Sequence, residues 1–232
     1  MQSLYDFLSE IGITVIQADF SRYVVDVNRP HISETLVGKY NKSAIYTSDT
    51  WHDPILSGDA TDLMIHDRMI NYYHPYHHTL FQILSNTREQ FGHAYLFDLH
   101  SFDGFINDSI CLGSRDNQTA PTLHPLTRNA LSHDFTSIAE NKIYRGGFIT
   151  QKYGAIDNVQ ALQIELRYTE YLKERTYEGD RFPDIDPLKF ESTKKRLKRA
   201  FQEIVRSKSA QPKIYYSSGN HSVATSLARR VP

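Results

Sequence analysis

The chain has 232 residues and a mass of 26.8 kDa, which suits one globular domain that buries most of its apolar surface. Its formal net charge of -1 and its lack of a long apolar run argue against recruitment by nucleic acid or a membrane. The single cysteine, Cys111, excludes an intrachain disulfide, and residues 1–12 lack the pattern of a signal peptide, so we expect a cytoplasmic protein.

The first predicted elements are a helix and two short strands. Residues 4–11 place apolar side chains at helical spacing, and Gly12 supplies a stop. The β-branched runs 13–16 and 23–27 predict buried strands. Residues 30–59 contain many turn-forming residues and little periodicity, so we expect a long loop of the kind that often carries function.

The middle of the chain predicts a long helical region followed by a buried strand. A helical pattern runs over residues 61–91, where Pro75 either kinks one helix or opens a second. The apolar run 94–101 is typical of a central parallel strand covered on both faces. A short strand is expected at 109–113, and residues 123–139 are weakly helical.

The C-terminal third predicts one more interior strand, at 159–166, and then a helix that starts at Asp186 and Pro187. Residues 189–208 carry eight Lys or Arg side chains against two Glu. This pattern favours a solvated helix face over a nucleic-acid surface, because the total charge is close to zero.

Alternating strands and helices predict an α/β fold, with a mixed, largely parallel sheet flanked by helices. We expect a single domain over residues 1–210, followed by a poorly ordered, Ser-rich tail at 211–232. The sequence does not determine the oligomeric state.

The strongest local signal for chemistry is the motif DLHSFDG at residues 98–104. Polar side chains at the carboxyl end of a buried strand lie where open α/β sheets place their sites. Asp98 and His100 are two residues apart and therefore share a face, so the carboxylate could orient the imidazole or bind a ligand with it. Two satisfied structural residues would fit the spacing equally well.

Two other strand ends carry candidate groups. In QIELR, Glu165 could be a desolvated general base, although a structural pair with Arg167 is the better reading from these residues alone. In VDVNRP, Asn28 and Arg29 follow a predicted strand, and a guanidinium there could grip a carboxylate. Most arginines at strand ends merely face solvent.

Two further groups have plainer explanations. His74 and His78 have a spacing that can bind a metal, but the tyrosines around them favour an aromatic amphipathic helix. Gly146 and Gly147 could bring backbone N–H groups to an anion or could form a simple turn.

Several blocks together resemble the N-formylglutamate amidohydrolase, or N-formylglutamate deformylase, family. They follow in the family's order between about residues 4 and 175, and they read LYDFLSEIGITV, SRYVVDVNRP, YYHPYHHTL, LFDLHSFDG, GGFITQKYG and ALQIEL. The family resembles a branch of the zinc carboxypeptidase superfamily, which implies a phosphorylase/hydrolase-like fold.

The resemblance implies roles for particular residues. His100 would be a zinc ligand, and Glu165 would be the base that activates a zinc-bound water. The substrate would be a small N-acyl amino acid, held by Asn28, Arg29, Arg145 and Tyr153. His77 matches a family position for which the resemblance implies no role.

The implied reaction is hydrolysis of N-formyl-L-glutamate to formate and glutamate, as in histidine breakdown. Family members carry a PHSG-like segment with further zinc ligands upstream of LYDF, and Met1 here falls just before that block. Three explanations are open: an incomplete gene product, a metal-free binder of acylated amino acids, or a site rebuilt from His52, Asp53 or Asp98. A deacylase or carboxypeptidase that acts on another acyl amino acid is a further alternative.

Overall fold

The main sheet runs through the centre of the protein, as seen in a computed structural model that describes residues 2–32, 36–104, 106–174, 184–208 and 214–218. Its order is β1-β8-β4-β7-β5-β6, and a separate parallel pair is formed by β2 and β3. The strands are β1 (Thr14–Gln17), β2 (Val37–Gly38), β3 (Ile45–Tyr46), β4 (Ala94–Phe102), β5 (Ile110–Gly113), β6 (Ile138–Glu140), β7 (Val159–Arg167) and β8 (Ile214–Ser218).

The four strands β1, β8, β4 and β7 are mutually parallel, whereas β5 runs antiparallel to β7 and β6 is parallel to β5. This arrangement confirms the predicted mixed, largely parallel sheet. The continuous apolar runs of β4 and β7 explain their neighbouring central positions, because both faces of each strand are covered.

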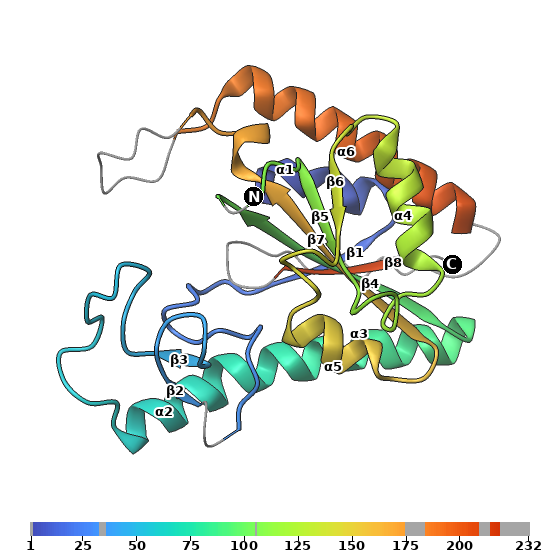
Figure 1. Ribbon diagram of the computed structural model, residues 1–232. Helices are drawn as coiled ribbons and strands as arrows, with labels where there is room; N and C mark the ends of the chain where they lie inside the picture. The colour runs from blue at the N-terminus through green and yellow to red at the C-terminus, as the bar shows by residue number, and fades with distance from the viewer. Residues whose placement is uncertain (1, 33–35, 105, 175–183, 209–213, 219–232) are drawn as a thin grey trace.

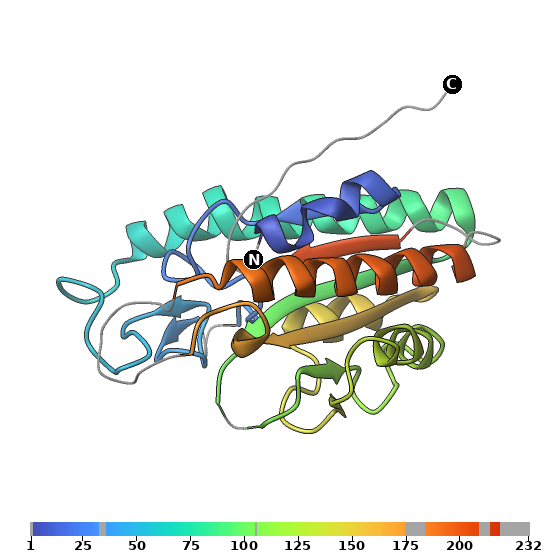
Figure 2. The same cartoon turned by 90° about the horizontal axis from the view of Figure 1, so that it is seen from above.

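Helices cover both faces of the sheet (Figure 1). One layer holds α1, α4 and α6, the other holds α3 and α5, and α6 lies over the sheet roughly along its strands (Figure 2). The helical elements are α1 (Gln2–Tyr5), the 3-10 helix η1 (Asp6–Ile11), α2 (Asp62–Arg68), the π turn η3 (Met69–Tyr73), α3 (His74–Phe91), α4 (Leu123–Ser132), α5 (Phe148–Gly154), the 3-10 helix η4 (Tyr168–Glu170) and α6 (Pro187–Lys208).

Two apolar cores lie on the two faces of the sheet. Alternate residues of β4 divide between them, so Phe97 and Leu99 pack in the core beneath α1, α4 and α6. Leu96, together with Ala161 of β7, packs in the core that contains residues of α3 and α5. The second face is the one that carries the candidate site.

The basic helix α6 uses several of its charges in contacts with the rest of the chain. Asp186 caps its start by accepting hydrogen bonds from the N–H groups of Leu188 and Lys189, as expected. Lys194 pairs with Asp6, Lys198 with Glu10 and Arg199 with Asp134. Exposed pairs of this kind contribute little to stability individually, but together they orient α6 against its neighbours.

The region 61–91 forms two helices joined by the π turn η3. Pro75 lies in the first turn of α3, so it opens the second helix. Proline has no N–H and crowds the carbonyl four residues earlier, and the wider turn relieves that crowding. The N–H of His74 accordingly donates to the carbonyl of Met69, five residues back.

Residues 23–27 do not form the predicted strand. They form turns and irregular backbone, and Val25 and Val27 are nevertheless fully buried. Val27 packs in the same core as α3, and the N–H of Asp26 donates to the carbonyl of Ala44. A run of apolar residues predicts that the side chains are buried, and in this segment they are buried although the backbone is not paired in a sheet.

Two predicted boundaries near the C-terminal half also differ. The weakly helical stretch 123–139 is helical only to Ser132, and β6 begins at Ile138. Within the expected tail, residues 214–218 form β8, which is paired with both β1 and β4. The rest of that tail, 211–213 and 219–232, lies outside the described residues. Among the described helices, none is long and apolar enough to cross a bilayer.

Candidate active site

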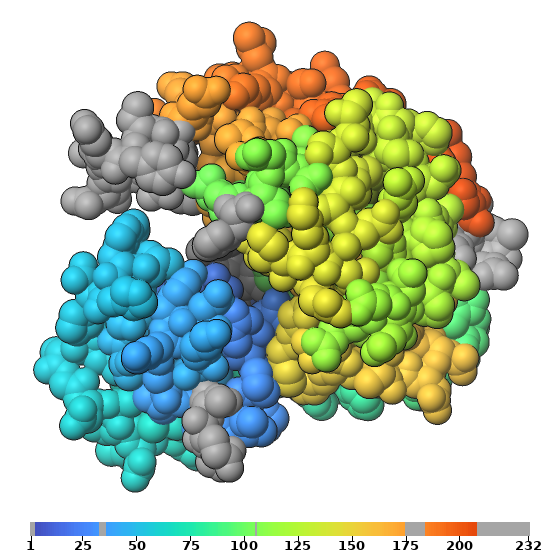
Figure 3. Space-filling view, viewed as in Figure 1, coloured from blue at the N-terminus to red at the C-terminus, as the bar shows by residue number. Residues whose placement is uncertain are grey.

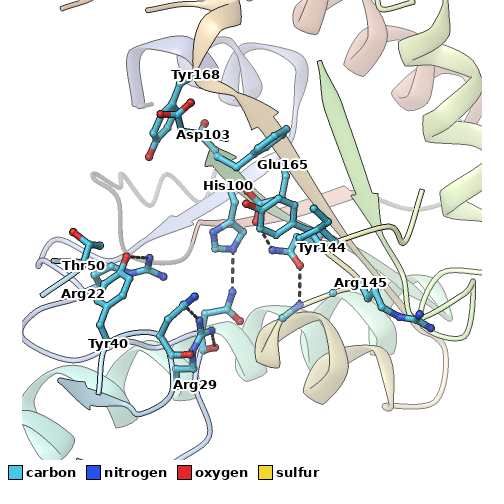
Figure 4. Close-up of a pocket in the computed structure, with 18 residues that line it drawn as sticks. Arg22, Arg29, Tyr40, Thr50, His100, Asp103, Tyr144, Arg145, Glu165 and Tyr168 are labelled. Atoms are coloured by element: carbon cyan, nitrogen blue, oxygen red, sulfur yellow. Dashed lines mark hydrogen bonds between the residues drawn. The ribbon is translucent and has the colours of Figure 1, made fainter. Parts of the chain in front are cut away.

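Strand register brings the two main sequence motifs together. His100 of β4 is paired with Glu165 of β7, and Asp98 with Gln163. These four polar residues continue the sheet face that is apolar at the other end of both strands. The carboxyl half of this face therefore presents the candidate site (Figure 4).

A cleft of about 460 Å³ opens over these residues. Figure 3 shows the molecule hollowed between the blue-to-cyan part of the chain and the green-to-yellow part. The cleft is mainly polar, and the side chains around His100 and Glu165 include Arg22, Arg29, Tyr40, Asp103, Tyr144 and Tyr168. Cations, carboxylates and phenols thus line one space.

The imidazole of His100 lies against a buried carboxylate. Its Nε2 is 2.8 Å from Oδ1 of Asp98, which is fully buried. Burial disfavours the imidazolium, but the attraction and hydrogen bond to Asp98, with a smaller contribution from Glu165, outweigh burial and raise the pKa of His100. Nδ2 of Asn28 lies 3.0 Å from the same His100 nitrogen and 3.3 Å from Oδ2 of Asp98. The three side chains form one hydrogen-bonded cluster.

Glu165 has the properties of a general base. It is 5% exposed, and burial raises its pKa to about 7 even though the neighbouring His100 lowers it. Gln163 donates to Oε1 of Glu165 at 2.8 Å and accepts a hydrogen bond from the N–H of Gly147 at 2.7 Å. A carboxylate that titrates near neutrality can take a proton from water and return it.

Arg167 does not form the pair with Glu165 that the residues alone favoured. Its guanidinium donates to the carbonyl and side-chain oxygens of Asn107 at 3.0 and 3.3 Å. The carboxylate of Glu165 is therefore left to the cluster around His100.

Asn28 is buried beside His100 rather than displayed in the open part of the cleft. Its Oδ1 accepts a hydrogen bond from the N–H of Ile149, which fixes the orientation of the amide. A Cβ on Gly147 would lie 2.6 Å from Nδ2 and 2.7 Å from Oδ1 of Asn28. The close approach of this glycine explains why no side chain can be accommodated there.

Both predicted substrate-binding arginines line the cleft, and they differ in their hydrogen-bond partners. Arg29 donates to the carbonyl of Asn28 and to both oxygens of Asn41, which uses three of its five N–H groups. Arg145 pairs with Asp116, and both side chains are more than half exposed. In Figure 4 the Arg145 side chain points away from His100.

Tyr153 lies away from the cleft. It is 1% exposed, and its hydroxyl is 2.8 Å from Nδ1 of His77. Both side chains belong to the interior beneath α3 and α5, so the geometry gives Tyr153 a contact with His77 in place of the expected contact with substrate.

Arg22 lines the cleft but was missed in the sequence. Its Nη1 donates to the hydroxyl of Tyr40 at 3.0 Å and its Nη2 to Oδ2 of Asp26 at 3.1 Å. Burial disfavours the guanidinium, but Asp26, Tyr46 and Tyr40 together outweigh burial and raise the pKa of Arg22 further. Its buried Nε has no hydrogen-bond partner in the described part of the chain. Nothing in the local sequence distinguishes this arginine, because only the fold brings it to the cleft.

A metal site cannot be assembled from the described residues alone. Their His, Cys, Asp and Glu side chains form no group of three that could hold a metal ion. This finding covers the cluster at Asp98 and His100, the loop residues His52 and Asp53, and the histidines of α3. Catalytic zinc normally has three protein ligands.

Known proteins similar to the chain share one description. Residues 1–172 match the family described as N-formylglutamate amidohydrolase. An N-formylglutamate deformylase of Pseudomonas putida is 29% identical over 194 residues, which cover 76% of this chain and 72% of that protein. The N-formylglutamate deformylase of Pseudomonas aeruginosa is 30% identical over 189 residues, covering 74% and 69%.

Solved structures support the fold. An N-formylglutamate amidohydrolase from Ralstonia eutropha aligns with a TM-score of 0.74 at 23% identity, covering 89% of this chain and 80% of that one. A gene product of Agrobacterium tumefaciens aligns with a TM-score of 0.58 at 19% identity, covering 81% and 69%.

Proposed function

The chain belongs to the N-formylglutamate amidohydrolase family, and from that premise we propose that it hydrolyses N-formyl-L-glutamate to formate and glutamate. The observation that carries the proposal is the pairing of His100 with Glu165 at the base of a cleft that arginines line. Relatives with this family description are hydrolases, and the cleft offers a buried base and cations that suit an acidic substrate.

Glu165 carries the proton transfers in this proposal. Its carboxylate takes a proton from a water molecule, whose oxygen forms a bond to the formyl carbon. The C–N bond then breaks, and Glu165 passes the proton to the departing nitrogen of glutamate. The pKa near 7 suits both steps, because the group exchanges its proton readily at neutral pH.

The two carboxylates of the substrate require positive charge. Among the hydrogen bonds of the described residues, Arg29 keeps two N–H groups for a carboxylate, and Arg22 brings its guanidinium charge to the lining of the same cleft. Arg145 would have to leave Asp116 to join them. We therefore assign substrate binding first to Arg29 and Arg22, and to Arg145 only at the mouth of the cleft.

Zinc, with His100 as a ligand, stays a prediction about the cofactor. The described residues do not fit a catalytic zinc by themselves, because they supply no group of three donors. Measuring the zinc content of the purified protein, before and after dialysis against a chelator, tests this prediction directly.

The deciding experiment measures formate release from N-formyl-L-glutamate by wild type and by Glu165→Gln. We expect turnover by wild type and a loss of at least roughly 100-fold in kcat by the variant, as for removal of a general base. N-acetylglutamate and N-formylaspartate serve as comparison substrates, and faster turnover of either would reassign the acyl group or the amino acid. Wild-type protein that releases no formate, with or without added zinc, would refute the proposal.

A metal-free binder of acylated amino acids is the second candidate, and the absence of a three-donor group among the described residues favours it. Such a binder would be stabilised by N-formylglutamate without consuming it. Calorimetric binding that disappears in Arg29→Ala, combined with no formate release, would select this alternative.

A further inference from the structure

Side chains from one long helix replace the strand ladder that residues 23–29 lack. Backbone carbonyls that are buried without strand pairing need other donors. Three side chains of α2, η3 and α3 supply them. Arg68 donates to the carbonyls of Tyr23 and Val24, at 3.2 and 3.0 Å. Tyr73 donates to the carbonyl of Arg29 at 2.8 Å. His77 donates to the carbonyl of Val27 at 3.0 Å.

The π turn keeps these donors on one side of the helix. Arg68 and Tyr73 are five residues apart, whereas Tyr73 and His77 are four apart. An α-helix brings residues four apart to the same face, and the wider π turn accommodates the extra residue between the first two. The π turn η3 covers Met69–Tyr73, where that extra residue is needed.

The hydrogen bonds of His77 determine its tautomer. Nε2 faces the carbonyl of Val27 and must carry the proton, which leaves Nδ1 unprotonated. Nδ1 lies 2.8 Å from the hydroxyl of Tyr153, which also lies 3.1 Å from the backbone carbonyl of His77. Burial, with a smaller contribution from Lys152, lowers the pKa of His77 to about 3. The ring is therefore a neutral bridge from α5 to the segment before Asn28 at every physiological pH.

Asn28 is held from all sides by this arrangement. The carbonyls on either side of it, of Val27 and Arg29, are bonded by His77 and Tyr73. Its own N–H donates to Oδ1 of Asp26 at 2.8 Å. With its Oδ1 bonded to the N–H of Ile149, the remaining Nδ2 has only one direction, toward Asp98 and His100.

Resting on the proposed function, we propose that His77 is a positioning residue that holds Asn28 in place, and that Asn28 in turn orients the Asp98–His100 pair. The bridge reaches the reacting groups only through Asn28, and this restriction makes the proposal testable.

A double-mutant cycle between His77 and Asn28 tests the route. We expect His77→Ala to lower kcat by roughly 30-fold with little change in KM, and His77→Gln, which can bridge the same groups, to stay within roughly fivefold of wild type. In an Asn28→Ala background, His77→Ala should cost less than roughly threefold, because its route is already removed. Leu84→Ala, a buried change two turns along α3, controls for lost stability and should leave kcat unchanged.

A second measurement does not depend on turnover. Hydrogen exchange of the Asn28 side-chain amide, followed by NMR, should accelerate at least roughly tenfold in His77→Ala and remain slow in His77→Gln and Leu84→Ala. Tyr153→Phe, which removes one partner of the bridge, replaces His77→Ala if that variant does not fold. Additive losses of kcat in the cycle, or unchanged exchange of the Asn28 amide, would overturn the proposal. Inactive wild type would refute the proposed function alone, because the exchange measurement would still decide the role of His77.

Discussion

Replacing Glu165 with glutamine should stabilise the protein at alkaline pH, although it lowers kcat by at least roughly 100-fold. In the folded chain burial raises the pKa of this carboxyl from its ordinary 4.5 to about 7. Between these two values the folded protein holds a proton that the unfolded chain has released. The free energy of unfolding therefore falls as pH rises through this window, and above pH 7 the buried charge costs about 3 kcal/mol.

Glutamine keeps the shape of the protonated acid and carries no charge at any pH. It also loses the attraction of the carboxylate to His100, which offsets part of the gain. We expect Glu165→Gln to exceed wild type by about 2–3 kcal/mol at pH 8 and to match it near pH 5. For a protein of this length the gain at pH 8 corresponds to roughly 4–12 °C in Tm.

Urea unfolding followed by circular dichroism, at pH 5 and pH 8, measures the difference. Glu89→Gln is the matched control, because Glu89 is exposed on α3 and its replacement should change stability equally little at both pH values. The reasoning is refuted if Glu165→Gln gains nothing at pH 8, or if it gains the same amount at both.

Three further predictions concern the pH profile, the glycine beside Asn28 and the sheet. If Glu165 must be ionised, kcat/KM should fall roughly tenfold between pH 8 and pH 6, and a flat pH–rate profile would contradict its role. Gly147→Ala places a Cβ against both polar atoms of the Asn28 amide, so we expect a loss of about 1–3 kcal/mol in urea unfolding and of at least roughly tenfold in kcat; wild-type behaviour in both would argue against the close packing. Ending the chain at Ala210 removes β8 and should abolish the cooperative thermal transition, whereas ending it at Ser218 should preserve it; equal melting of the two would show that β8 is dispensable.

The central strands were predictable because their apolar runs are continuous. Residues 94–101 and 159–166 could only be buried on both faces, and β4 and β7 occupy the middle of the sheet. The run at 23–27 shows the limit of the same signal. Its valines are buried in an irregular segment whose backbone carbonyls accept hydrogen bonds from side chains of α2, η3 and α3. The pattern of apolar residues cannot distinguish such a segment from a buried strand.

The tail illustrates a second limit. Residues 214–218 read IYYSS, and their first three residues favour a strand, but they lie in a segment that was expected to be a tail. They pair with β1 on one side and β4 on the other. The partners lie about 120 to 200 residues away in the chain, so local composition indicates a strand but does not identify the strands that it pairs with.

The sequence by itself determined the family, the α/β class, the two central strands and the polar groups at their ends. These features are local, because a few neighbouring residues determine a strand end, a helix cap or a motif. Only the tertiary structure decided that His100 and Glu165 are register partners, that Arg22 reaches the cleft and that Tyr153 is buried away from it. Strand register and side-chain contacts join segments that are far apart in the sequence. They therefore follow from the packing of the whole chain, and no single stretch of the sequence predicts them.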